Sequence, residues 1–284
     1  MAKSLCEHSF SIENEDGDSI DGDVRFLDTG ALQPVVVFVH GFKGFKDWGP
    51  FSDWGRALAH AGFVSVHLNV SHNGVSAEAP TAFTELDRFA RNTYTRELDD
   101  VAAVIDAVAS HALPAAPIDD SRIGLMGHSR GGGTAILQAA RDDRVKALTT
   151  WAAVSTFIGR FTEAQIRDWQ TQGHTEIVNS RTGQRMRMDR VVYDDAMAHA
   201  DALDIEAAAQ RLDIPWLIVH ARDDDAVDAS EAETLAGAND RAQVLWAEGG
   251  HTFGGSHPHT GAIPDSLQHV WDATIAFFSE HLGD

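Results

Sequence analysis

The stretch that most constrains the fold of this 284-residue chain is the pentapeptide at residues 127–131, which has the pattern Gly-x-Ser-x-Gly. A short apolar run at residues 123–126 precedes it, and a helix-forming stretch follows it. This order predicts a strand, a sharp turn and a helix, with the Ser129 hydroxyl exposed above a sheet. Gly127 and Gly131 fit such a turn, because a side chain at either position would clash. The same pentapeptide also occurs in ordinary glycine-rich turns, so its meaning depends on the rest of the chain.

Apolar runs alternate with helical patterns along most of the chain. Residues 35–39 form an unbroken β-branched and aromatic run, which is typical of a strand buried on both faces. Residues 93–109 carry apolar side chains at helical spacing, and residues 7–28 predict a β-hairpin. This alternation predicts an α/β fold with a mostly parallel central sheet of about eight strands flanked by helices. We therefore expect a single α/β domain over residues 1–284.

One segment, residues 155–211, breaks this alternation. Within it, residues 179–184 predict a hairpin turn. We expect a cap-like insertion over the carboxyl ends of the strands, where open α/β sheets bind ligands. A surface excursion without substrate contact is the alternative. The segment is rich in arginine, with Arg160, Arg167, Arg181, Arg185, Arg187 and Arg190.

A serine hydroxyl needs a base within hydrogen-bond reach and a third group that fixes the tautomer of the base. His251 is the candidate base, because it follows the last predicted strand and two glycines that let a short loop project the imidazole. The candidate acid lies in the aspartate-rich loop after the strand that ends at His220. The spacing alone leaves three carboxylates open, namely Asp223, Asp224 and Asp225.

Acyl transfer at a serine also needs two N–H donors for the oxyanion. The backbone N–H of Arg130, directly after Ser129, is one candidate. The backbone N–H of Phe42 is the second, because it follows the buried strand and because Gly41 lets the backbone approach closely. An ordinary strand-to-helix turn is the alternative at this position.

These motifs together resemble the α/β-hydrolase superfamily. Residues 40–44 and 127–132 look like its dienelactone-hydrolase-like and feruloyl-esterase-like serine hydrolase branch. The resemblance selects Asp224 as the acid, since residues 220–227 are similar to a His-Gly-x-x-Asp-x-x-Val loop with Ala221 in place of glycine. Dienelactone hydrolases proper carry a cysteine nucleophile where this chain has a serine.

The resemblance implies a serine hydrolase that cleaves carboxylic esters through an acyl-enzyme intermediate, with no cofactor. Ser129, His251 and Asp224 would form the triad, and Phe42 and Arg130 the oxyanion hole. A thioesterase or small acyl-peptidase with the same triad is the alternative, and a non-catalytic or lyase-type member of the fold is less favoured. Loop position suggests that six aromatic side chains wall the pocket: Phe42, Phe45, Trp48, Phe157, Phe161 and Trp169.

The amino-acid composition limits the binding partners that can be expected. The 43 acidic and 22 basic side chains give a net charge of −21, which disfavours nucleic acid and anionic membranes. His257 and His259 lack a matching carboxylate or helical spacing, so no metal site is expected. The single cysteine, Cys6, excludes an internal disulfide. No apolar stretch is long enough to cross a bilayer, so we expect a cytoplasmic protein with a small-molecule ester substrate, and a homodimer remains open.

Overall fold

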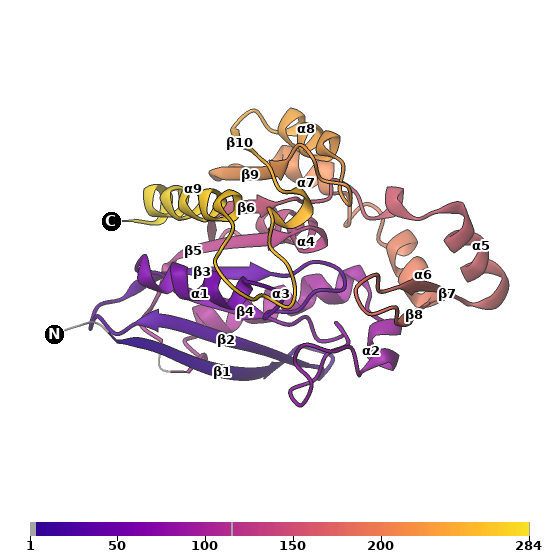
Figure 1. Ribbon diagram of the computed structural model, residues 1–284, viewed down its shortest axis with the longest axis horizontal. Coiled ribbons are helices and arrows are strands. Elements are labelled where there is room, and N and C mark those ends of the chain that lie inside the picture. Colours follow the sequence, from indigo (N-terminus) through magenta and orange to yellow (C-terminus); the bar gives the residue numbers. More distant parts are fainter. Residues whose placement is uncertain (1–3, 115, 284) are drawn as a thin grey trace.

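The computed structural model describes residues 4–114 and 116–283, and these form an eight-stranded central sheet (Figure 1). The spatial order is β1-β2-β4-β3-β5-β6-β9-β10. Strand β2 runs antiparallel to both of its neighbours, and the pairs from β4 to β10 are parallel. The predicted α/β fold with a mostly parallel sheet is therefore confirmed. The strands are β1 (Leu5–Glu13), β2 (Ser19–Leu27), β3 (Gln33–Val39), β4 (Val64–Leu68), β5 (Ile118–His128), β6 (Val145–Trp151), β9 (Trp216–Ala221) and β10 (Ala242–Ala247).

Helices cover both faces of the sheet. The α1 and α9 helices pack on one face, and α3, α4, α7 and α8 pack on the other. Among the described residues, none of the helices has the length and apolar character that a bilayer crossing requires. The helices on the two faces are α1 (Phe51–His60), α3 (Tyr94–Ala109), α4 (Arg130–Ala139), α7 (Ile205–Arg211), α8 (Ala229–Ala238) and α9 (Asp265–Leu282), and the short α2 (Leu86–Ala90) precedes α3 in the chain.

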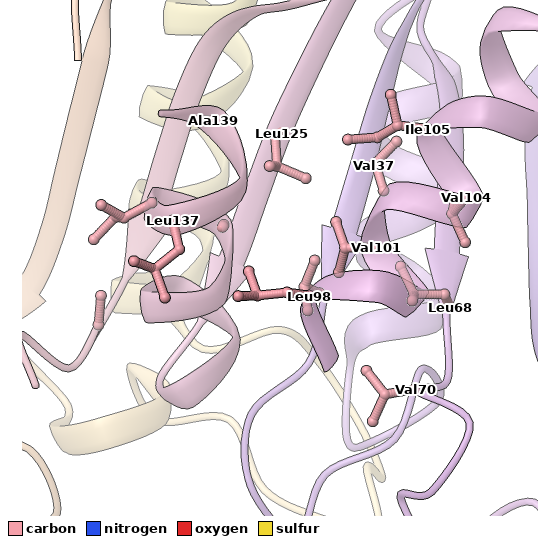
Figure 2. Packing of buried hydrophobic residues seen from close by; sticks show 14 of the residues in the cluster. Val37, Leu68, Val70, Leu98, Val101, Val104, Ile105, Leu125, Leu137 and Ala139 are labelled. Atoms are coloured by element: carbon pink, nitrogen blue, oxygen red, sulfur yellow. The ribbon is translucent and has the colours of Figure 1, made fainter. Parts of the chain in front are cut away.

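The central strand β3 explains why the sheet needs two helical layers. Because strand side chains alternate between faces, Val37 packs in the cluster that contains α3 and α4, whereas Phe38 packs in the cluster that contains α1 and α9. Both side chains are fully buried. Figure 2 shows Val37 beside Ile105 and Val101 of α3, between the helix and the sheet. An uninterrupted apolar run is therefore what this position requires.

The sequence specifies the α3 helix through its N-cap residue and through its apolar stripe. Thr93 is its N-cap, and the Thr93 side chain accepts a hydrogen bond from the backbone N–H of Arg96. Its apolar side chains fall on one stripe and are buried against the sheet (Figure 2). Burying an aliphatic side chain of this size stabilises the fold by roughly 1.5–3 kcal/mol. The stripe consists of Leu98, Val101, Val104, Ile105 and Val108.

The segment after β6 contains its own small set of elements. Figure 1 shows α5, α6 and the β7–β8 hairpin together at one end of the molecule. The hairpin turn expected at residues 179–184 is present, with the backbone N–H of Asn179 bonded to the carbonyl oxygen of Gln184 at 2.8 Å. This group comprises a 3-10 helix (Ile158–Arg160), α5 (Glu163–Gln172), β7 (His174–Val178), β8 (Arg185–Asp189) and α6 (Arg190–Ala198).

Candidate active site

The turn at Ser129 connects β5 to α4 and holds the serine backbone at φ 57° and ψ −121°, which is strained for a residue with a side chain. The backbone N–H of Ser129 is bonded to the carbonyl oxygen of Trp151 at 2.8 Å, which fixes the turn to β6. A Cβ atom on Gly127 would lie 2.1 Å from the Gly131 oxygen, and one on Gly131 would lie 2.3 Å from the His40 oxygen. The turn therefore requires glycine at both positions.

His251 and Asp224 face each other across the loops after β10 and β9. His251 lies in a short 3-10 helix (Gly250–Thr252), and its Nδ1 is 2.8 Å from Oδ2 of Asp224. The Asp224 side chain is completely buried. Its other oxygen, Oδ1, accepts hydrogen bonds from the backbone N–H groups of Ala226 at 2.9 Å and Val227 at 3.0 Å. These bonds fix the carboxylate in the orientation that meets the imidazole.

The charge state of Asp224 follows from these contacts. Burial pushes the pKa of the Asp224 carboxyl upward, but the hydrogen bonds from His251, Val227 and Ala226 and the nearby imidazole lower the pKa below its usual value. An ionised carboxylate only accepts hydrogen bonds, so the proton between the two side chains belongs to Nδ1 of His251. In the neutral imidazole, Nε2 of His251 is then the nitrogen that carries no proton and can accept one.

The neighbouring aspartates have different surroundings. Asp223 accepts hydrogen bonds from the backbone N–H groups of Gly250 at 3.1 Å and Gly249 at 3.2 Å. Its carboxylate therefore ties down the loop that carries His251 rather than contacting the imidazole. Asp225 is exposed. Of the three aspartates that the spacing left open, the structure brings Asp224 to His251.

The loop after β3 lies directly against the serine. A Cβ atom on Gly41 would lie 2.9 Å from Cβ of Ser129, so the backbone approaches as closely as a glycine allows. Within residues 4–114 and 116–283, no acceptor takes a hydrogen bond from the backbone N–H of Phe42 or of Arg130. Both N–H groups belong to residues that line the same cavity as Ser129. They are available to an oxygen atom of a bound molecule.

Two buried histidines that the sequence did not single out support these loops. His40 follows β3, and burial lowers the pKa of the His40 imidazole to about 4, with Arg130 acting in the same direction. His128 precedes the serine, and its Nε2 is 2.9 Å from the carbonyl oxygen of His251. Burial and the nearby His251 lower the pKa of His128 to about 3. The sequence signal for this supporting role is position, because His40 directly precedes Gly41 and His128 directly precedes Ser129.

The cavity above the serine has a volume of about 510 Å³. Ser129 and His251 both line it, although the described contacts include no hydrogen bond between their side chains. Such bonds are often long in unliganded enzymes and tighten when substrate binds. Four of the six expected aromatic residues line the cavity, but Phe45 and Trp169 do not, because both pack into the hydrophobic core with no exposed surface. The four expected residues that line the cavity are Phe42, Trp48, Phe157 and Phe161, and Phe51 and Tyr94 line it as well.

The two histidines that the sequence offered as metal ligands, His257 and His259, have protein partners. Nδ1 of His257 accepts a hydrogen bond from the backbone N–H of Gly49 at 2.9 Å, and Nε2 of His259 lies 3.8 Å from Asp53. In the described part of the chain, no three His, Cys, Asp or Glu side chains are grouped so that they could hold a metal ion.

Serine hydrolases of the α/β-hydrolase fold are built in this way, and the chain is one of them. It belongs to the prolyl oligopeptidase family, whose model matches residues 51–284. The predicted membership of the α/β-hydrolase superfamily is confirmed. Solved structures that share the fold include an esterase domain from a Rhodothermus marinus protein. Among curated proteins, the uncharacterized protein YcjY of Escherichia coli (strain K12) is 31% identical over 131 residues. That match spans 46% of this chain and 38% of the relative.

Solved structures share the fold over almost the whole chain. Est1E from Butyrivibrio proteoclasticus has a TM-score of 0.69 and 17% sequence identity over 97% of this chain and 99% of its own. Est1E has also been solved with ferulic acid bound. A puromycin-hydrolyzing peptidase from Mycobacterium tuberculosis has a TM-score of 0.68 and 19% identity over 98% of this chain and 39% of its own. At these identities the likeness establishes the fold alone.

Proposed function

We propose that the protein hydrolyses carboxylic esters of small molecules, with Ser129 as nucleophile, His251 as general base and Asp224 as the group that orients His251. One observation carries this proposal. The 2.8 Å contact between Nδ1 of His251 and Oδ2 of Asp224 lies in the loops beside a cavity that Ser129 also lines. A serine held in a strained turn next to an oriented imidazole is the arrangement that acyl transfer needs.

The proposed reaction begins when Ser129 Oγ attacks the ester carbonyl carbon and passes its proton to Nε2 of His251. The tetrahedral oxyanion accepts hydrogen bonds from the backbone N–H groups of Phe42 and Arg130. His251 then gives its proton to the leaving alkoxide oxygen as the carbon–oxygen bond breaks, which leaves an acyl-enzyme. A water molecule, deprotonated by His251, attacks the acyl carbonyl, and Ser129 leaves with the proton restored.

Electrostatics favour this division of roles. During each proton transfer His251 becomes positively charged, and the buried Asp224 carboxylate lies next to that charge. The lowered pKa of Asp224 keeps the carboxylate ionised at neutral pH, so it stabilises the imidazolium rather than taking its proton. The two oxyanion donors act in addition, and each such donor is worth roughly 2.7–4 kcal/mol of transition-state stabilisation in this class of reaction.

The insertion at residues 155–211 is the proposed cap of the substrate pocket. Four parts of it contribute lining residues: Phe157 and Arg160 come from the 3-10 segment, Gln165 from α5, Asn179 from the β7–β8 turn and Met188 from β8. Because these residues line the same cavity as Ser129, their position supports the proposal that the cap contacts the substrate. A surface excursion would leave the cavity lined by the sheet-end loops alone.

Covalent labelling with a fluorophosphonate probe tests the nucleophile. We expect folded protein to be labelled at Ser129, with labelling lost in the Ser129→Ala variant and in heat-denatured protein. Hydrolysis is then measured on oxygen esters, thioesters and amides that share one acyl group. Faster turnover of the oxygen esters supports the proposal, while a preference for the thioester or amide assigns the same triad to a thioesterase or acyl-peptidase. Folded protein without a label at Ser129 contradicts every hydrolytic version.

A further inference from the structure

The cavity has a charge opposite to that of the protein. The chain carries 43 acidic and 22 basic side chains, but the residues that line the cavity include four cations and no aspartate or glutamate. A surface of net charge −21 attracts cations and repels anions in the surrounding solution. A neutral ester would need no compensation for that field, whereas an anionic one would. The four lining cations are Lys43, Arg130, Arg160 and Arg181.

Two of these cations are neutralised by the protein. Arg130 Nη1 is 3.3 Å from Oε1 of Glu97, and the Arg130 guanidinium lies 3.7 Å from the centroid of the Phe42 ring. Arg160 is paired with Glu231 and donates a second hydrogen bond to the carbonyl oxygen of Ala226. Their charges are therefore balanced within the fold, and their role at the cavity wall is structural or steric.

Lys43 and Arg181 are different. Within the described residues, neither side chain forms an ion pair or donates a hydrogen bond, and each one only approaches an aromatic ring. Lys43 Nζ is 5.9 Å from the centroid of Phe42, and the Arg181 guanidinium is 5.9 Å from the centroid of Phe45. Burial and the nearby Arg130 and Arg181 lower the pKa of the Lys43 ammonium, so these positive charges act on one another. A bound anion would relieve that repulsion.

The turn that carries Arg181 supplies a further donor. Asn179 lines the cavity, is 4% exposed, and has an Nδ2 group without a hydrogen-bond partner. Its Oδ1 accepts the backbone N–H of Arg181 at 3.2 Å, which orients the amide and holds the turn. An unpaired buried donor costs free energy unless a ligand or water meets it. Ser180, between these two residues, also lines the cavity.

The conformation of Lys43 points the same way. Its φ angle is 56°, in the left-handed region that favours glycine, and it immediately follows the proposed oxyanion donor Phe42. The lysine therefore adds a positive charge to the cavity wall next in sequence to the residue whose N–H group is proposed to bind the oxyanion. Backbone strain of this kind is concentrated at ligand-binding positions.

We propose that the substrate is an anionic ester, which carries a carboxylate that binds between Lys43 and Arg181 while its ester carbonyl faces Ser129. This inference rests on the proposed esterase function and adds the chemical class of the substrate. The planar guanidinium suits a carboxylate because it can donate two parallel hydrogen bonds, and the ammonium adds a second charge. The carboxylate can belong to the acyl half or to the alcohol half, and the test distinguishes these two.

The test compares esters that differ only in that charge. One pair is the monophenyl ester of suberic acid and its terminal amide, with the charge on the acyl half. The other pair is the hexanoate ester of 4-hydroxybenzoate and that of 4-hydroxybenzamide, with the charge on the leaving group. We expect kcat/KM for the anionic member of at least one pair to exceed that of its neutral partner by about ten- to a hundredfold.

Variants connect the ratio to the two cations. Lys43→Gln and Arg181→Gln should each reduce this ratio about three- to tenfold, and the double variant should bring it close to one. Arg185→Gln is the matched control, because Arg185 lies on the same hairpin, is paired with Glu176 and does not line the cavity. That control should keep the full ratio. Arg181→Glu should favour the neutral ester.

A second measurement does not depend on the choice of ester. Benzoate and benzamide are added during fluorophosphonate labelling of Ser129, and benzoate should slow the labelling of the unmodified chain more than that of the double variant. The proposal of an anionic substrate is wrong if the anionic and neutral esters of both pairs have equal kcat/KM and if benzoate and benzamide protect Ser129 equally. The proposed esterase function would stand in that case. Absence of labelling at Ser129 defeats the proposed function itself, so the two failures are distinguishable.

Discussion

His40 donates a hydrogen bond from Nδ1 to the carbonyl oxygen of Gly41 at 2.9 Å, and the backbone N–H of Gly44 meets the same oxygen at 3.0 Å. The carbonyl of Gly41 and the N–H of Phe42 belong to one planar peptide unit. Fixing the oxygen therefore fixes the direction of the N–H group proposed for the oxyanion. Nε2 of His40 accepts the backbone N–H of Val70 at 3.3 Å, which sets the tautomer.

We predict that His40→Phe lowers kcat about ten- to a hundredfold with a small change in KM. The substitution removes the donor to Gly41 at similar side-chain size, and a misdirected oxyanion donor costs transition-state rather than ground-state binding. The full loss of one such donor costs roughly 10²–10³ in kcat, so partial misorientation should cost less. Ester hydrolysis by the two proteins at matched folded concentration gives kcat and KM separately.

His40→Asn is the companion variant, because its side-chain amide can donate from a position near that of Nδ1. It should recover part of the lost kcat. If His40→Phe instead raises KM and leaves kcat unchanged, His40 acts on substrate binding and the positioning role is wrong.

The cluster of three aspartates gives a second prediction. Asp224→Asn should reduce kcat by about 10³–10⁴, since an amide cannot hold the imidazole in the tautomer that accepts the serine proton. Asp225→Asn should leave kcat within about twofold, because Asp225 is exposed. Asp223→Asn should have an intermediate effect, since an amide oxygen accepts more weakly from the N–H groups of Gly249 and Gly250.

Steady-state kinetics on the three variants, with circular dichroism as a folding check, separates these outcomes. A loss at Asp223 as large as that at Asp224 would show that the loop anchor and the orienting acid are not distinct roles.

These aspartates also show what the sequence can and cannot predict. The strand, the turn and the helix around Ser129 follow from local rules, because glycine sterics and apolar runs act over a few residues. Which of three adjacent carboxylates turns inward depends on the turn that β9 makes, where the N–H groups of Ala226 and Val227 bind one oxygen of Asp224. That geometry is not encoded by spacing.

The pocket shows the same limit at longer range. Lys43 and Arg181 are 138 residues apart in sequence and meet at one cavity because the β7–β8 hairpin lies beyond the strand ends. Phe45 is aromatic and close to the oxyanion loop, yet it is completely buried and does not line the cavity. Aromatic side chains occur both in hydrophobic cores and in pocket walls. The sequence pattern alone therefore could not show which of these aromatic residues line the cavity.

The glycines of the turn give a third prediction, on stability. Gly131→Ala should destabilise the fold by several kcal/mol or prevent folding, because its Cβ would lie 2.3 Å from the backbone oxygen of His40, which cannot move without shifting β3. Gly237→Ala is the matched control. Gly237 lies near the end of α8, is exposed, and has no atom within 4 Å of an added Cβ.

The control should stabilise the protein by roughly 0.5–1 kcal/mol through helix propensity. Urea unfolding followed by tryptophan fluorescence measures both variants. Unfolding midpoints that coincide for Gly131→Ala and the unmodified chain would mean that the turn relaxes without the glycine.

A fourth prediction concerns pH. His128 is buried, and burial together with the nearby His251 lowers the pKa of its imidazole from an unfolded value of 6.5 to about 3. Between these two pH values the unfolded chain binds a proton at this residue and the folded chain does not. The unfolded state therefore gains stability as pH falls, and the free energy of unfolding decreases by about 1.4 kcal/mol per pH unit from this group alone.

His128→Gln removes the titrating group and keeps an amide that can donate to the carbonyl oxygen of His251. The free energy of unfolding of this variant should fall less steeply with acidification, by about 1.4 kcal/mol per pH unit between about pH 5.5 and 4.5. Urea unfolding at a series of pH values gives both curves, and the comparison uses their slopes, so a uniform loss of stability in the variant does not affect it. Parallel curves would show that His128 is protonated in the folded protein over this range, and the neutral, buried imidazole behind the His251 loop would then be the wrong description.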